Sequence, residues 1–284
     1  MMRSKVFMGL GALIATGLLT ISGLPAGAPK VQTTSGGTYL TTLAGGYTPT
    51  PLGWAGRYWR VAAGSTMTPN MDHTLRVGSR GRTMRFEIRN TDNDNAASDS
   101  SGVRRAELSG SLRSDPTRLP NGAPLWGAMS FNHHGWADPA GMSTLMGGVY
   151  GQIHIGSRFG GSPAVAFRRT KRGQFRITTR GEYDTAGSVR YEAPLSFDRV
   201  HHLVYRVVLD PHQGSLTVWL DGAKIVDVAD ASIGSRHAQS YLNLGLYFSG
   251  GITSPVVAEY GNVVYPTKAP LTNLVTSPPA WPTG

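Results

Sequence analysis

The chain has 284 residues, of which 40% are hydrophobic and 15% are charged, a composition that can bury a sizeable core and excludes a chain disordered as a whole. It has no cysteine, which excludes disulfide bonds, thiolate metal sites and a cysteine nucleophile. Lys and Arg (27) outnumber Asp and Glu (17), and the net charge of +10 favours a polyanionic partner, either nucleic acid or an acidic polysaccharide; a basic surface that only confers solubility is the alternative.

The N-terminus has the pattern of a secretory leader. Arg3 and Lys5 precede an apolar run over residues 6–24, and small residues follow it. We therefore expect residues 1–28 to be removed, the mature protein to be secreted to the extracellular space or the periplasm, and no stable membrane association after removal. An uncleaved anchor is the alternative, because a run of this length could just span a bilayer.

Residues 29–52 are rich in Thr, Gly and Pro and are predicted to form a linker or a loosely attached first strand. From residue 53 to residue 268, short runs of β-branched and aromatic residues alternate with turn signals, among them Asp221-Gly222, a strong hairpin turn. Residues 269–284 form a Pro-rich tail that we expect to be extended. Alternation predicts that one side of each strand enters a core; these positions include Met84, Phe86, Ile88, Phe175, Ile177, Leu242, Leu244, Leu246 and Phe248.

No convincing amphipathic helix follows the leader, so the pattern predicts an all-β protein built as a two-sheet antiparallel β-sandwich. The opposite sides of several strands carry Arg, Gln, His, Tyr and Asn rather than the Lys, Glu and Thr of an ordinary solvent face. Planar, multidentate donors suit a concave sheet that binds a ligand in a groove. An ordinary polar outer face is the alternative for any single strand.

Familiar catalytic motifs do not explain these residues. The chain has no G-x-S-x-G, H-E-x-x-H or phosphate-loop motif, and its five glutamates (Glu87, Glu107, Glu182, Glu192, Glu259) form no E-x-D-x-E array of the kind that would favour a glycoside hydrolase. The pairs His133-His134 and His201-His202 would point to opposite faces of a strand and are poor metal ligands. The stretch "NTDNDNAASDSSG" (residues 90–102) lacks the glycine and distal glutamate of a calcium loop, so we predict a turn, no required cofactor and no metal site. A structural calcium ion is the alternative, although no clear motif supports it.

Three predicted strands carry the polar residues that remain. Each strand places a small group on one face: Arg105 and Glu107 in "RRAELSG", Gln152 and His154 in "YGQIHIG", and Tyr241, Asn243 and Tyr247 in "YLNLGLYFS". In this order the motifs resemble those of the β-jelly-roll polysaccharide lyases, R-x-E-x-R, Q-[I/V]-H and Y-x-K-x-G-x-Y-x-Q. This group comprises the alginate lyases of polysaccharide lyase family 7, the heparin lyase I-like lyases and the glucuronan lyases. The resemblance covers roughly residues 54–266 and implies a concanavalin-like jelly roll.

The resemblance also implies roles. Arg105 would pair with the carboxylate of a uronate and Gln152 would donate an amide hydrogen bond to it. His154 would donate to it when neutral or accept the C5 proton of one substrate epimer. Tyr247 would protonate the leaving oxygen and could act as base for the other epimer. Glu107 is expected to be structural, as the ion-pair partner of Arg105. The expected substrate-binding residues are Tyr241, Asn243, Arg89 and Arg176.

Three positions depart from the pattern. Ser109 stands where the family often has a second arginine, Asn243 replaces the usual lysine, and Ser249 replaces the usual glutamine. These changes leave a non-catalytic carbohydrate-binding jelly roll as the alternative to a lyase. A nucleic-acid binder is favoured by charge alone, because no run of aromatic residues for base stacking accompanies the basic stretch "RRTKRG" (residues 168–173), which is predicted to be a hairpin tip. We expect a monomer that binds an anionic polysaccharide and no nucleic acid.

Overall fold

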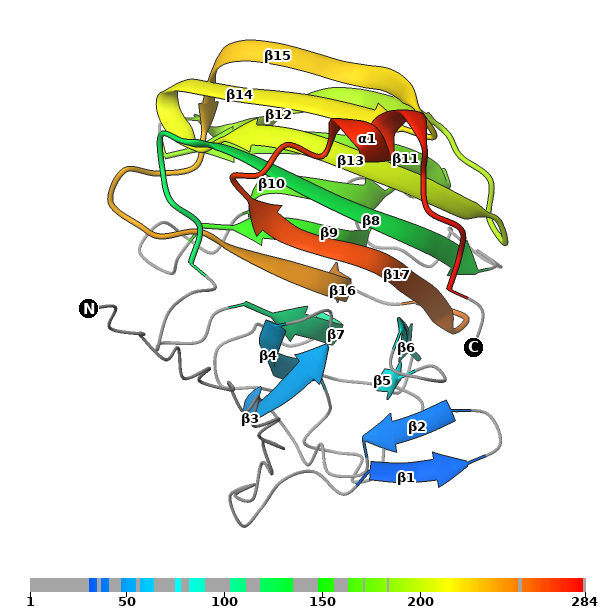
Figure 1. Ribbon diagram of the computed structural model, residues 1–284. Coiled ribbons are helices and arrows are strands. Elements are labelled where there is room, and N and C mark those ends of the chain that lie inside the picture. Colours follow the sequence, from blue (N-terminus) through cyan, green and yellow to red (C-terminus); the bar gives the residue numbers. More distant parts are fainter. Residues whose placement is uncertain are drawn as a thin grey trace, which may run out of the picture.

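The protein is a sandwich of two antiparallel β-sheets, which Figure 1 shows as two layers. The computed structural model describes residues 31–34, 37–40, 47–54, 57–63, 75–77, 82–89, 103–110, 118–134, 148–155, 163–170, 172–182, 184–249 and 252–282. The predicted all-β sandwich is therefore confirmed. The predicted turn over residues 90–102 lies outside the described residues, as does the leader.

The chain passes several times between the two sheets. One sheet has nine strands in the order β1 (Val31–Thr34), β2 (Gly37–Leu40), β5 (Leu75–Val77), β6 (Thr83–Ile88), β17 (Val256–Thr267), β8 (Pro124–His134), β13 (Val200–Val208), β14 (Asp210–Leu220) and β15 (Ala223–Ile233). The other has eight strands in the order β12 (Asp184–Pro194), β11 (Gln174–Gly181), β10 (Pro163–Arg169), β9 (Gly148–His154), β16 (Tyr241–Ser249), β7 (Val103–Ser109), β4 (Arg57–Ala63) and β3 (Tyr47–Trp54). Strands β1 to β3 fall largely in the segment predicted to be a linker or first strand.

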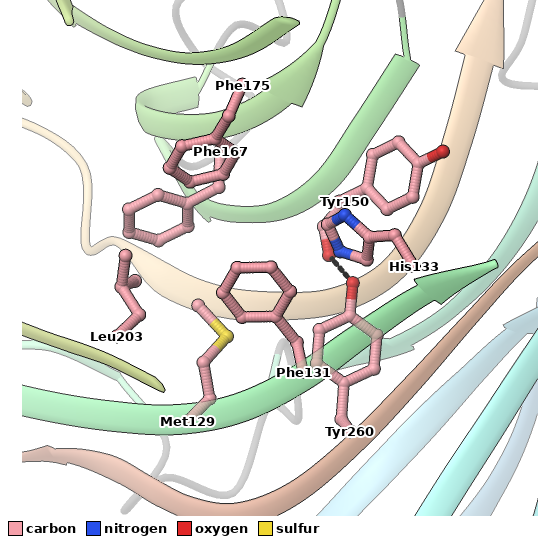
Figure 2. Close-up of a pocket in the computed structure, with 8 residues that line it drawn as sticks. All are labelled: Met129, Phe131, His133, Tyr150, Phe167, Phe175, Leu203 and Tyr260. Atoms are coloured by element: carbon pink, nitrogen blue, oxygen red, sulfur yellow. Dashed lines mark hydrogen bonds between the residues drawn. The ribbon is translucent and has the colours of Figure 1, made fainter. Parts of the chain in front are cut away.

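The apolar sides of the strands form one core between the sheets. All nine positions predicted from alternation are buried in it. Figure 2 shows its aromatic centre, where Phe131 and His133 of β8 meet Tyr150 of β9 and Tyr260 of β17 around a cavity of about 10 Å³. The Tyr260 hydroxyl donates a hydrogen bond to the Tyr150 carbonyl oxygen. A cavity of this size holds at most one water, so the core is closely packed.

A β-bulge in β9 explains why Tyr150 lies in the core. Strict alternation would place it on the same face as Gln152. In the structure Gly151 is paired with Phe167, but Val149 is paired with the next residue, Arg168, so Tyr150 has no partner on β10. The extra residue turns the Tyr150 ring inward and leaves Val149 to face outward beside Arg168.

The basic stretch joins β10 to β11, which pair as a hairpin as predicted, but its Arg169 is buried and not at a basic surface. Arg169 Nη1 donates hydrogen bonds to the carbonyl oxygens of Gly173 (3.1 Å) and Leu195 (2.7 Å), and its guanidinium lies 4.2 Å from the centre of the Phe197 ring. Its Nε donates to Nδ1 of His133 at 3.1 Å, so the neutral His133 ring carries its proton on Nε2. Burial and the nearby Arg169 charge hold the pKa of His133 well below its usual range. Arg169 therefore stabilises the fold internally and does not contribute to a basic surface.

The C-terminal tail is partly helical rather than extended. Leu274 and Val275 of the helix α1 (Thr272–Thr276) pack against a cluster of Trp126, Ala128 and Val204. The Trp219 ring of β14 stacks on the Trp126 ring of β8 in the same place, with centroids 5.6 Å apart. Figure 1 shows α1 lying over the outer side of the nine-stranded sheet. No helix in the part of the chain that the structure describes is long and apolar enough to cross a membrane.

The predicted hairpin turn at Asp221-Gly222 is confirmed. It joins β14 to β15, with φ of 50° at Asp221 and 84° at Gly222, the pair of positive values that a tight hairpin requires. The Asp221 carboxylate also accepts a hydrogen bond from the His202 backbone N–H at 2.8 Å and lies 2.7 Å from His201 Nδ1. These contacts hold the turn against β13.

A pH dependence of stability is expected from His134 on the outer side of the nine-stranded sheet. Its Nε2 lies 2.9 Å from Glu259 and its Nδ1 lies 3.0 Å from Asp198. The hydrogen bond to Glu259 raises the pKa of His134 above 6.5, although burial opposes the rise. The stabilisation is therefore complete below pH 6.5 and is lost as the pH rises through the raised pKa. Because His134 is partly exposed, we expect a loss of less than about 1 kcal/mol.

Unfolding free energies measured in urea between about pH 6 and pH 9 would check this. The difference between the wild type and His134→Gln should shrink as the pH rises. A difference that does not change with pH would contradict the assignment.

Candidate functional site

The three strands singled out in the sequence are neighbours in the eight-stranded sheet. Strand β16 lies between β7 and β9 and is hydrogen-bonded to both. Ala106, Leu108 and Ile153 face the core, so the residues between them point away from it. We call the side of this sheet that points away from the core the polar face.

The strand register sets the polar side chains in rows across the polar face. From β7 to β11, one row reads Ser109, Asn243, Gln152, Ala166 and Thr178, and a second reads Arg105, Tyr247, Val149, Arg168 and Arg176. In a third row, Tyr241 lies opposite His154. Residues from three distant parts of the sequence thus share one surface.

Arg105, Glu107 and Gln152 form a connected buried group. The Arg105 guanidinium lies 4.7 Å from the centre of the Tyr247 ring, and its Nε lies 3.5 Å from Glu107 Oε2. Gln152 Nε2 donates a 2.7 Å hydrogen bond to Glu107 Oε1. Since a carboxylate only accepts hydrogen bonds, this bond fixes which end of the Gln152 amide faces Glu107. Glu107 is completely buried and orients both neighbours, as expected of a structural residue.

His154 and Tyr241 form a second group on the polar face. Their rings stack with centroids 5.1 Å apart and an interplanar angle of 18°. The guanidinium of Arg118 lies 5.0 Å from the centre of the Tyr241 ring. Both rings are only partly buried, so this aromatic and cationic surface suits the apolar face and hydroxyls of a sugar.

The two groups are separated along the strands. Tyr241 and Tyr247 are six residues apart on β16, about 20 Å in an extended strand. Gln152 lies between them in the register, because it is paired with Asn243. A substrate unit that contacts both His154 and Tyr247 therefore requires both side chains to lean toward the row of Gln152.

Asn243 occupies the position where the resembling lyases carry lysine. Its side chain is buried between Gln152 on β9 and Ser109 on β7. Its Oδ1 has no hydrogen-bond partner among the described residues. The row therefore offers an amide oxygen, an acceptor, where a lysine would offer a cation. For Ser249 the structure gives only its strand position, opposite Val103.

Gly245 fits a position that no other residue can take without strain. Its φ is +132°, and a Cβ there would overlap the Ala106 carbonyl oxygen and lie 2.8 Å from Glu107 Cα. We expect Gly245→Ala to lower the free energy of unfolding in urea by about 2 kcal/mol or more. Gly151→Ala on neighbouring β9 is the control, since its Cβ would find its nearest atom at 3.5 Å. Equal losses in the two variants would contradict this explanation.

The two remaining predicted binding residues differ in position. Arg176 on β11 lies on the polar face, where it pairs with Glu192 at 2.6 Å. Arg89 follows β6 in the nine-stranded sheet and pairs with Glu87 at 2.6 Å. Its neighbour Ile88 faces the core from the opposite side of the sandwich, so Arg89 does not share the polar face and we leave it out of the candidate site.

Sequence reasoning missed Arg118 and assigned no role in the site to Arg168. Arg118 precedes an isolated bridge between Leu119 and Ser240, and no periodic pattern marks it. Arg168 was recognised only as part of a basic stretch. Among the described residues, no group of three or more His, Asp or Glu side chains is placed to hold a metal ion.

Comparisons with known proteins give matches by structure. No protein-family model and no curated protein matches the sequence. The structure is similar to an endo-β-1,4-glucuronan lyase from the fungus Trichoderma reesei, with a TM-score of 0.50 and 14% identity over 78% of this chain and 92% of that one. It is also similar to the alginate lyase AlgAT5 of polysaccharide lyase family 7, with a TM-score of 0.50 and 12% identity over 74% of this chain and 93% of that one. The chain therefore has the fold of these polysaccharide lyases.

Proposed function

We propose that the protein is a secreted polysaccharide lyase that cleaves a uronate-containing acidic polysaccharide by β-elimination. The observation that carries the proposal is the arrangement of Arg105, Tyr247, Gln152 and His154 on one face of three adjacent strands. The fold shared with a glucuronan lyase and an alginate lyase supports it. The net charge of +10 would attract such a polymer.

The first requirement of the reaction is to neutralise the uronate carboxylate. The C5 proton becomes acidic only when the charge that develops on the neighbouring carboxylate is stabilised by preorganised donors. Arg105 offers a guanidinium held in place by Glu107 and Tyr247. Gln152 gives one amide hydrogen to Glu107, and its NH₂ group carries a second hydrogen for the substrate.

The second requirement is a pair of proton transfers. A base removes the C5 proton, the C4–C5 double bond forms, the C4–O4 bond breaks, and an acid protonates the departing O4. In our proposal Tyr247 protonates O4, and His154 or Tyr247 accepts the C5 proton, according to the epimer. The guanidinium of Arg105 over the Tyr247 ring would stabilise negative charge that forms on its oxygen.

A carbohydrate-binding protein without catalytic activity is the second candidate. The observation that favours it is Asn243, which stands in place of a lysine in the row of Gln152 and whose Oδ1 accepts no hydrogen bond from the described residues. The aromatic pair of His154 and Tyr241 would serve binding alone equally well.

A panel assay separates the two candidates. The protein is incubated with alginate, glucuronan, heparan sulfate and chondroitin sulfate, and near-ultraviolet absorbance reports 4,5-unsaturated ends. We expect absorbance to rise on at least one polyuronate, and double-stranded DNA to bind no more tightly than that polymer at the same salt concentration. Binding to a polyuronate without any rise in absorbance would favour the non-catalytic candidate.

A further inference from the structure

A pocket of about 140 Å³ lies beside the candidate site, where the outer strands of the eight-stranded sheet meet. Its polar side chains are Arg168 on β10, Thr178, Thr179 and Arg180 on β11, and Ser188 on β12. Pro163, which also lines it, is paired with His154, and Arg168 is paired with Val149, the neighbour of Tyr247. The pocket therefore lies next to the candidate site on the polar face, over β10, β11 and β12 and on the side away from β7.

The pocket gathers positive charge. No acidic side chain is among the described residues that line it. Among the described residues, the half-buried Arg168 donates one hydrogen bond, from Nε to Thr178 Oγ1 at 3.2 Å, so its two terminal nitrogens can donate to a ligand. Burial and then the charges of Arg180 and Arg176 lower the pKa of Arg168 to about 10. On the same face, the Arg176 guanidinium pairs with Glu192 at 2.6 Å.

We propose that this pocket is an oxyanion-binding subsite that takes the carboxylate or the sulfate ester of a sugar unit other than the one being cleaved. Guanidinium groups bind both anions through paired hydrogen bonds, and the Thr178 and Ser188 hydroxyls add donors. An anion bound there would relieve the repulsion between Arg168 and Arg180.

The position of the pocket decides which sugar unit it serves. Arg168 and Tyr247 are separated by one intervening strand, so their backbones are about 10 Å apart. This span is longer than a single pyranose ring. The anion in the pocket therefore belongs to another unit of the same polymer, and the subsite would select chains that carry charge on more than one unit. This inference rests on the proposed function for the identity of the polymer.

The test compares Arg180→Gln with Arg206→Gln. Arg206 lies on β13 in the other sheet, so its loss removes the same charge without touching the polar face. For the polymer that the wild type cleaves best, Arg180→Gln should raise KM by about tenfold, the loss expected of one charge-assisted hydrogen bond, with kcat nearly unchanged. Arg206→Gln should match the wild type. Arg168→Lys, which keeps the charge and loses the paired donors, should also raise KM and serves if Arg180→Gln fails to fold.

Direct binding separates failure of this inference from failure of the proposed function. Calorimetric affinities for chondroitin and chondroitin sulfate oligosaccharides are measured with the same variants. If Arg180→Gln loses affinity for both ligands, the pocket binds a carboxylate. If it loses affinity for the sulfated ligand alone, the pocket binds a sulfate. An Arg180-dependent affinity in a protein that cleaves nothing would keep the subsite and reject the lyase. Cleavage by the wild type with equal KM and equal affinities in Arg180→Gln and Arg206→Gln would reject the subsite and keep the lyase.

Discussion

Tyr247→Phe should lower kcat by about 10² or more, because general acid–base catalysis usually contributes on this scale. The substitution keeps the ring, and with it the contact with Arg105, and removes only the hydroxyl. Leu246 and Phe248 on either side stay buried in the core, so β16 should remain in place. Affinity for the polymer should be largely retained, since the proton transfer is made only in the transition state.

Tyr191→Phe is the matched control for this experiment. Tyr191 lies on β12 of the same sheet, where its ring contacts Phe175 of the core with centroids 6.5 Å apart. Tyr191→Phe should have the kcat of the wild type and at most a slightly lower free energy of unfolding. A Tyr247→Phe enzyme with the same kcat as the wild type would remove Tyr247 from the mechanism.

Arg105→Lys should lower kcat/KM by about 10²–10³, the range seen when a donor to a developing oxyanion is removed. Lysine keeps a positive charge near Glu107 but cannot offer the planar pair of donors. Arg105→Ala would be a poorer test, because breaking a buried ion pair costs about 3–5 kcal/mol and would confuse instability with lost catalysis. Steady-state kinetics on the preferred polymer, with a thermal unfolding curve for each variant, would measure the effect.

Arg104→Lys controls for the exchange of arginine for lysine on the same strand. Arg104 is also buried, but it is paired with Phe248, whose side chain enters the core, so its side chain lies on the other face of β7 from Arg105. The kcat/KM of Arg104→Lys should equal that of the wild type. Equal losses in the two variants would show that β7 tolerates no lysine, and would contradict a specific role for Arg105.

Much of the fold could be predicted from local alternation. In β16 every second residue from Leu242 to Phe248 is buried, as period two requires for a strand with one face in a core. Alternation cannot, however, reveal a bulge. The burial of Tyr150 in the core, which results from the bulge in β9, was therefore not predictable from the pattern. Alternation also cannot show that α1 would form in a Pro-rich tail, because what favours that helix is the packing of Leu274 and Val275 against the cluster around Trp126.

The candidate site was predictable where each strand carried its own short motif. What the motifs could not supply was the pairing between strands far apart in sequence. Arg89 directly follows a strand as regular as the others, β6, but that strand belongs to the nine-stranded sheet. Arg118 and Arg168 reach the polar face through a loop and through the register of β10 with β9, and neither is visible in a sequence pattern. Glu107 was expected to pair with Arg105, but its bond to Gln152 depends on the order of β7, β16 and β9.

The most direct measurement of the central claim is a digest of the preferred polyuronate in heavy-oxygen water, with the products analysed by mass spectrometry. β-Elimination breaks the C4–O4 bond without adding water. The account therefore predicts products with one C4–C5 double bond at the new non-reducing end and no heavy oxygen beyond that exchanged in a control of product alone. Saturated products that have gained one heavy oxygen at each cleavage would show hydrolysis and would contradict the account.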